Sequence, residues 1–157
     1  MAMSYKTKEA KSYQKDIIEL LNEEIPKQNW KKSENKFQHY YMDVVFYFPR
    51  IDMDANNYFK CLADAITDSG LVWIDDTQLC ERVNGIYYDS ANPRMEIAIH
   101  PVNYIGVFPD RNSFNNFIEK CETCKRYCRN CSILKKSKEG RITGEVTSLE
   151  CKKYASK

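Results

Sequence analysis

The run of residues 40–48 constrains the fold of this chain more than any other feature. Its side chains alternate between two faces, and Pro49 closes it. Alternation with a period of two is typical of a β-strand that buries one face. The residues expected on the buried face are Met42, Val44, Phe46 and Phe48. Such a strand needs a sheet around it and other elements packed over its apolar side.

Two helices are expected to supply that packing. Residues 8–25 form an amphipathic helical pattern that Pro26 is expected to end. Its apolar members are Tyr13, Ile17, Leu20 and Leu21. A second helix is expected to begin near Asn56 or Asn57, both good caps, and to end at Gly70. Its predicted buried stripe consists of Phe59, Leu62, Ala63 and Ile66.

Two more strands, residues 82–88 and 94–100, are separated by a turn at residues 89–93. We therefore predict an α+β domain over residues 1–102, with a small, mostly antiparallel or mixed sheet packed with helices. Residues 103–157 are predicted to form a small basic appendage, because five of the seven cysteines lie after residue 120.

Composition excludes several classes of protein. Aromatic residues make up 13% of the chain, too many for a disordered protein, and no apolar run approaches the ~18 residues of a membrane span. With 5 glycines and no glycine-rich phosphate loop, a nucleotide cofactor is not expected. The start of the chain lacks an apolar signal segment, so we expect a cytoplasmic protein.

Charge is distributed unevenly along the chain. Residues 1–100 carry 12 basic and 16 acidic side chains, whereas residues 101–157 carry 12 basic and 6 acidic ones. An acidic body with a basic tail favours a polyanionic partner. Side chains that could contact DNA phosphates are Lys31, Lys32, Lys36, Arg82, Lys135, Lys136, Lys138 and Arg141. Taken singly, each of them is better explained as ordinary solvated surface charge.

Acidic residues gather around the second helix. Asp52 and Asp54 lie two apart after the first strand, where extended backbone would point them the same way. Asn56 and Lys60 share a helix face, and Asp75 and Asp76 follow the helix. Carboxylates beside a lysine suit hydrolysis of a phosphodiester with a divalent metal. Taken singly, each acid is better explained as part of a turn or cap, and Lys60 as a surface pair to Asp64, so only a pattern that includes them all favours a catalytic role.

The order of these elements resembles the RusA family of Holliday junction resolvases. The family has an Asp, then Asp-Asn two residues on, a Lys three after that Asn, an apolar helix ending in Gly, and Asp-Asp-x-Gln. The matching segments here are residues 54–60, 62–66 and 70–78. Residues 5–10, followed by Tyr13, are similar to the family's segment before its first helix. The resemblance covers roughly residues 5–102.

This resemblance implies a Mg²⁺-dependent homodimeric endonuclease that nicks two opposed strands of a four-way DNA junction. It implies that Asp54 and Asp76 are Mg²⁺ ligands, that Asp75 supports them and that Lys60 acts near the scissile phosphate. A two-fold dimer with one site per subunit would make two symmetric cuts. The expected setting is a bacterial or phage-infected cell.

Two features depart from the family pattern. Asn56 stands where the family has its second aspartate, so the site loses one anionic ligand. Asp52 could compensate, or the substitution could weaken or inactivate the site. In addition, only four residues precede the Tyr5 segment, where the family has a strand and a basic loop.

Cysteines in the tail predict a structural Zn²⁺ site, because thiols in a cytosolic chain favour metal binding over disulfides. Four thiolates would hold one ion in tetrahedral geometry. The preferred ligands are Cys121, Cys124, Cys131 and Cys151, which leaves Cys128 spare. In the alternative set, Cys128 takes the place of Cys131 or Cys151. The competing interpretation is a set of reduced surface thiols.

Three functions therefore compete. The first is a structure-selective endonuclease acting on four-way junctions. The second is a protein that binds branched DNA and cuts it weakly or not at all, because of Asn56. The third is a zinc-dependent regulator or adaptor that docks a protein.

Overall fold

The computed structural model describes residues 7–127, 129–141 and 144–157. The chain divides into two compact units, one ending at His100 and the other beginning at Pro101. Tyr5, Lys6 and Cys128, which entered the sequence predictions, lie outside the described residues. In the described ranges, no helix is long and apolar enough to span a bilayer.

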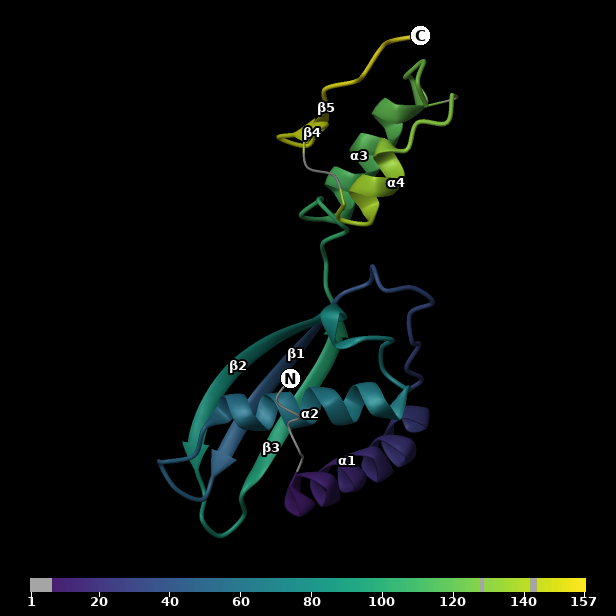
Figure 1. Cartoon of the computed structure of the whole chain (residues 1–157). Coiled ribbons are helices and arrows are strands. Elements are labelled where there is room, and N and C mark those ends of the chain that lie inside the picture. The colour runs from purple at the N-terminus through teal and green to yellow at the C-terminus, as the bar shows by residue number, and fades with distance from the viewer. Residues whose placement is uncertain (1–6, 128, 142–143) are drawn as a thin grey trace, which may run out of the picture. The chain divides into compact units, whose positions relative to one another are not determined.

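A three-stranded sheet forms the centre of the first unit (Figure 1). Strand β1 (Tyr40–Phe48) lies between β2 (Leu79–Tyr88) and β3 (Arg94–Pro101). β2 runs parallel to β1, and β3 returns in the opposite direction from the turn that follows β2. The sheet is therefore mixed. Of the two predicted alternatives, the mixed sheet is confirmed and the mostly antiparallel one is wrong, because α2 crosses between β1 and β2 and this connection makes the pair parallel.

Helices α1 (Lys8–Lys27) and α2 (Ala55–Ser69) pack on one face of this sheet (Figure 1). The predicted apolar face of β1 is buried, as is the stripe of α2 that was expected to face it. α1 differs from its prediction in two ways. Leu20 is 55% exposed, since Ile17, Leu21 and Ile25 are the α1 residues that reach the core. Pro26 lies inside the last turn, which continues to Lys27.

Between α2 and β2 the chain makes an irregular, well-buried connection. Gly70 ends α2 in the left-handed conformation, with φ of 68°. Val72 and Trp73 are then fully buried, and the Trp73 indole donates a hydrogen bond to Thr67 Oγ1 (2.8 Å). A short 3₁₀ helix, η1 (Asp76–Gln78), leads directly into β2. This connection fixes where the Asp75-Asp76 pair lies.

The second unit is built around a small core of its own. It contains α3 (Arg111–Glu122), α4 (Ile133–Lys138) and a hairpin of β4 (Val146–Thr147) and β5 (Glu150–Cys151). The buried apolar side chains of this core are Phe108, Phe114, Phe117 and Ile133. Gly106 packs against the end of α4, where an added Cβ would lie 2.0 Å from the Ser137 carbonyl oxygen. Only glycine fits that contact.

Candidate functional site

An open pocket of about 400 Å³ brings α2 together with the start of β2. Its lining combines acidic, amide and cationic groups with a floor of apolar side chains. The lining residues are Asn56, Phe59, Lys60, Ala63, Asp64, Asp76, Leu79 and Glu81. Three of the five residues predicted to be catalytic therefore share one pocket: Asn56, Lys60 and Asp76.

α2 supplies one wall of this pocket. Asn56, Lys60 and Asp64 are spaced four residues apart, so they lie on one face over successive turns of the helix. Asp54 is the N-cap of α2, and its Oδ1 accepts a hydrogen bond from the Asn56 backbone N–H (2.9 Å). The prediction that Asn56 or Asn57 caps the helix was therefore wrong. The cap fixes the first turn, and with it the position of Asn56.

η1 holds Asp76 at the opposite wall. Asp75 caps η1 by accepting hydrogen bonds from the Thr77 N–H (3.1 Å) and hydroxyl (2.8 Å). Asp76 is the first residue of η1 and is exposed to the pocket. The Asp75 cap thus fixes the backbone from which the Asp76 side chain projects.

Gln78 is fully buried, and its side chain holds the segment of Asp75 and Asp76 in place. Its Oε1 accepts hydrogen bonds from the backbone N–H groups of Ile74 (2.9 Å) and Asp75 (3.2 Å). Its Nε2 lies within hydrogen-bonding distance of three oxygens in the loop before β1: Ser33 Oγ, Asn35 O and Gln38 O. One side chain therefore ties the Asp-Asp segment to a loop about 40 residues earlier.

Lys36 reaches Asp75 from that loop, with Nζ 2.5 Å from Oδ2. Its hydrogen bond, followed by those from Thr77, holds the pKa of Asp75 far below its ordinary value. Asp75 is therefore ionised at neutral pH. Lys36 was expected to contact DNA phosphates, but in this structure its ammonium group is engaged by Asp75.

The remaining acidic residues lie elsewhere or were not anticipated. Asp54 and Asp75 do not line the pocket. Asp52 lies in a turn, not in extended backbone, and pairs with Arg50 (2.9 Å). Glu81, by contrast, lines the pocket although the sequence did not single it out. The predicted strand began at residue 82, so Glu81 was not assigned to a strand. In the structure β2 begins at Leu79, and Glu81 lies on the same face of β2 as Leu79.

Chemically, the pocket offers oxygen donors that suit Mg²⁺. These are the carboxylates of Asp64, Asp76 and Glu81 and the amide oxygen of Asn56. Mg²⁺ keeps several of its waters, so few protein ligands are needed. Across the residues that the structure describes, no three potential ligands are already gathered at metal-binding spacing.

Arg82, another predicted DNA contact, belongs to a cluster on the open face of the sheet. Its guanidinium makes a two-pronged contact with Asp43 (2.6 and 2.7 Å) and lies 3.8 Å from the centre of the Tyr41 ring. His100 Nε2 lies 3.0 Å from the same carboxylate. Arg82, followed by His100, holds the pKa of Asp43 at about 2, against an opposing effect of partial burial.

The other predicted DNA contacts are divided between the units. Lys31 and Lys32 belong to the first unit, where Lys32 Nζ donates to the Gly70 carbonyl (2.7 Å). The second unit carries Lys135, Lys136, Lys138 and Arg141, and Arg141 pairs with Glu139.

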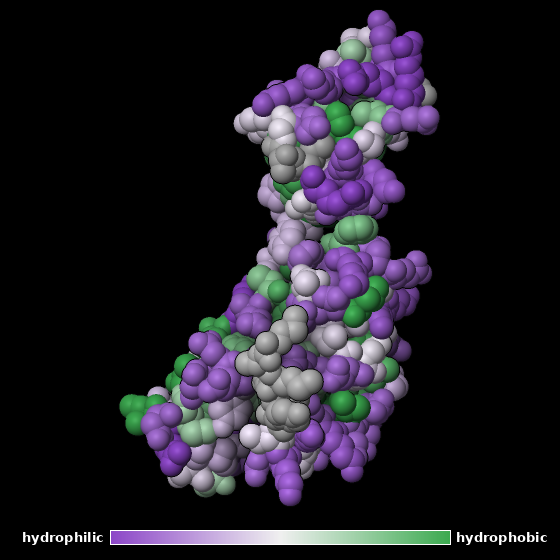
Figure 2. Space-filling view, viewed as in Figure 1, coloured by the Kyte–Doolittle hydropathy of each residue, from purple (hydrophilic) through white to green (hydrophobic). Residues whose placement is uncertain are grey.

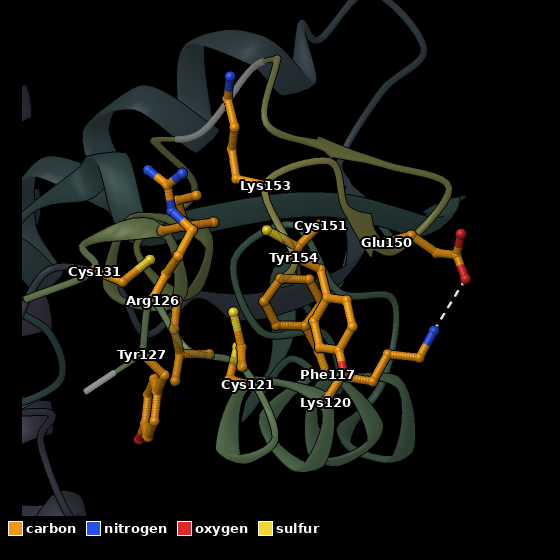
Figure 3. A pocket seen from close by; sticks show the side chains of 13 residues that line it. Phe117, Lys120, Cys121, Arg126, Tyr127, Cys131, Glu150, Cys151, Lys153 and Tyr154 are labelled. Atoms are coloured by element: carbon orange, nitrogen blue, oxygen red, sulfur yellow. Dashed lines mark hydrogen bonds and ion pairs between the residues drawn. The ribbon is translucent and has the colours of Figure 1, made fainter. Parts of the chain in front are cut away.

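A second pocket, of about 270 Å³, lies within the second unit and is lined by Cys121, Cys124, Cys131 and Cys151 (Figure 3). These are the four thiols that the sequence favoured as zinc ligands. The structure does not show an assembled metal site at them, since no group of three ligands was found among the described residues. Cys61 and Cys80, half-buried, belong to the first unit.

Comparison with known proteins gives one result. Residues 2–100 match the family model described as endodeoxyribonuclease RusA. Neither a curated protein nor a solved structure matches the chain. The match spans most of the first unit and includes every residue that lines the pocket between α2 and the start of β2.

Proposed function

Because this chain belongs to the RusA family of endodeoxyribonucleases, we propose that it is a Mg²⁺-dependent endonuclease that resolves four-way DNA junctions by paired, symmetric nicks. One observation carries the proposal. Asn56, Lys60 and Asp76 come from two separate segments of the family motif, and they line a single open pocket.

The side chains of the pocket have separable tasks in hydrolysis. Water forms a new P–O bond and loses a proton, while the ester P–O bond breaks and the departing deoxyribose oxygen gains one. Lys60 is exposed at the pocket, so its ammonium group can neutralise the charge that gathers on the phosphate oxygens. Asp76, Glu81 and Asn56 would hold Mg²⁺. When bound, the ion would polarise the phosphate toward attack.

Glu81 takes a specific part in this proposal. A neutral amide at position 56 contributes no charge, so the anionic ligands must come from the carboxylates that line the pocket, which are Asp64, Asp76 and Glu81. Glu81 lies in the same pocket, on β2, and is exposed to it. We assign to Glu81 the second carboxylate that Asn56 does not supply. Asp52, considered from the sequence, is instead paired with Arg50 in a turn.

Paired nicking requires two sites, and β2 offers a surface for a second copy of the chain. Among the described strands, β2 pairs with β1 alone, which leaves its other edge open. Val83, Ile86 and Tyr88 share the face of the sheet that carries the core, yet they are 48%, 46% and 54% exposed. Hydrophobic patches follow this edge of the first unit in Figure 2.

Sedimentation velocity tests the dimer. The wild-type protein is expected to sediment as a dimer and the Ile86→Lys variant as a monomer, because a charge at this edge opposes burial. Ile51→Lys is the matched control, since Ile51 is 81% exposed in the turn after β1. A wild-type monomer, or an Ile86→Lys dimer, would contradict this surface.

Cleavage of a synthetic four-way junction tests the activity. We expect symmetric nicks with Mg²⁺, none with EDTA, and little cutting of a linear duplex of the same sequence. Asn56 favours a second candidate function, which is binding of branched DNA without cleavage. Tight junction binding with no nicks at any Mg²⁺ concentration, even for Asn56→Asp, would support that alternative. Equal cutting of junction and duplex would contradict structure selectivity.

A further inference from the structure

The four pocket cysteines of the second unit come from four different places in its chain. Cys121 is in the last turn of α3, Cys124 follows that helix, Cys131 precedes α4, and Cys151 is in β5. In Figure 3 the sulfur atoms of Cys121, Cys131 and Cys151 face a common hollow. All four thiols therefore line one pocket.

The backbone around Cys124 is arranged for a sulfur anion. The Cys124 N–H donates to the Cys121 carbonyl (3.0 Å), which makes the tight turn of a two-residue-spaced cysteine pair. The Ala155 N–H donates to Cys124 Sγ (3.5 Å). Hydrogen bonds to sulfur are the supporting contacts that metal thiolates require.

Distant segments converge to complete the pocket. Ser148 and Leu149 both have positive φ, and the turn they form places Cys151 on the strand that returns. The segment after Cys151 then reaches the Cys124 turn, where the Lys125 N–H donates to the Ala155 carbonyl (2.8 Å). The last residues thus close the pocket over Cys124.

The core of this unit is small. Among the described residues it contains four buried apolar side chains, and Cys121, Cys131 and Cys151 pack partly buried against it, as do Ile105, Val107, Ile118, Leu134 and Val146. The described cysteines are all free. Units of this size commonly depend on a metal or a disulfide, because a single small core contributes too little.

We propose that Cys121, Cys124, Cys131 and Cys151 together bind one structural Zn²⁺ ion. Tetrahedral coordination by four thiolates is a closed arrangement typical of structural zinc. Binding replaces each thiol proton with a Zn–S bond. Among the described residues no three thiols are gathered at coordinating distance, so binding would require these side chains to move closer together. The site belongs to the second unit and does not depend on the nuclease pocket.

Nearby charge favours this occupant. Four thiolates and one Zn²⁺ carry two net negative charges, which must be offset when they are partly buried. Lys120, Arg126 and Lys153 all line the pocket. Lys120 pairs with Glu150 (2.9 Å), whereas in Figure 3 the charged ends of Arg126 and Lys153 extend away from the labelled sulfur atoms.

Metal analysis of the full-length protein tests the proposal directly. Protein produced in zinc-supplied medium should contain one zinc per chain, and serine at any of the four positions should lower this content severalfold. Cys80→Ser, in β2 of the first unit, and Cys128→Ser are the controls that should retain full zinc. Protein without zinc, or loss of zinc in Cys128→Ser but not in Cys131→Ser, would overturn the proposed ligand set.

A second measurement separates metal binding from misfolding of the variants. Co²⁺ added to wild-type protein from which zinc has been removed should give the intense visible bands of tetrahedral thiolate coordination, and Zn²⁺ should abolish them. Chelator should also make residues 101–157 sensitive to protease, with protection restored by Zn²⁺. Absence of the cobalt bands, or sensitivity that zinc leaves unchanged, would contradict the site. Iron in place of zinc would contradict the identity of the ion.

Discussion

Lys60, on the second turn of α2, and Asp76, at the start of η1, line the same pocket although a buried helix and an irregular connection separate them in the chain. Gly70 turns the chain at the end of α2, and Trp73 fixes the connection in the core. The packing of these buried residues therefore places the Lys60 ammonium group and the Asp76 carboxylate at one pocket.

Replacing Lys60 with methionine should remove charge compensation while keeping the aliphatic part of the side chain. We expect the rate of junction cleavage to fall by about 10²–10³-fold, the typical cost of removing one group that stabilises developing negative charge. The melting temperature should hardly change, since Lys60 is exposed. Lys11→Met, on α1, is the control. A variant that cuts at the wild-type rate would exclude Lys60 from catalysis.

The effects of substitutions at Glu81 and Asn56 on the rate of junction cleavage should depend on each other. Glu81→Gln alone should lower cleavage by about 100-fold, because it removes a carboxylate from a pocket that already has an amide at position 56. Adding Asn56→Asp to the Glu81→Gln variant should raise its cleavage rate again by about 10-fold. A double-mutant cycle would then show an interaction energy between the two positions. Strictly additive effects would show that the two side chains do not share an ion.

Gln78→Leu should destabilise the first unit by about 2–4 kcal/mol, because it leaves several buried hydrogen-bonding groups without a partner. Junction cleavage should also fall, since η1 would lose its tie to the loop at residues 33–38. Urea unfolding and the cleavage rate measure the two effects.

Gln14 provides the contrast to Gln78. It is also buried, but its Nε2 has no hydrogen-bond partner within the described part of the chain. Gln14→Leu should therefore be neutral or stabilising by up to about 1 kcal/mol. Equal losses of unfolding free energy in Gln78→Leu and Gln14→Leu would show that the hydrogen bonds of Gln78 do not account for its contribution to stability.

Much of the first unit could be predicted from its sequence because the relevant patterns are local. Alternation in β1 and helical spacing in α2 each gave the correct buried face. The order of the strands depends on a crossover that spans α2, so the parallel pairing of β1 with β2 has no local pattern. For the same reason Glu81 was missed: it enters the pocket only because β2 lies beside β1.

Asp54 as a metal ligand stays a prediction. Its place in the family motif implies that role, and in the structure its side chain caps α2 through the Asn56 N–H. A side chain at this position can serve either task, and residue spacing does not distinguish them. Leu20 was predicted to be buried from its place on the helical wheel, but it is exposed, and Ile17, Leu21 and Ile25 are the α1 residues that pack against the core.

Acid should destabilise the protein partly through Asp43. Its pKa of about 2 lies below the ordinary 3.8, because Arg82 and then His100 favour the ionised form. The stabilisation is therefore complete above about pH 4 and is lost as the pH falls toward 2. Asp43→Asn should be less stable than wild type at neutral pH, with a shallower loss of unfolding free energy between pH 4 and 2. Parallel pH profiles would contradict this role.

The most direct test of the nuclease site compares Asp76→Asn with Asp68→Asn on a four-way junction in Mg²⁺. Asp68 is exposed near the end of α2 and does not line the pocket. We predict that Asp68→Asn cuts like wild type, whereas Asp76→Asn binds the junction and leaves both strands intact. Cleavage by Asp76→Asn at the wild-type rate would show that the pocket is not where the phosphodiester bond is broken.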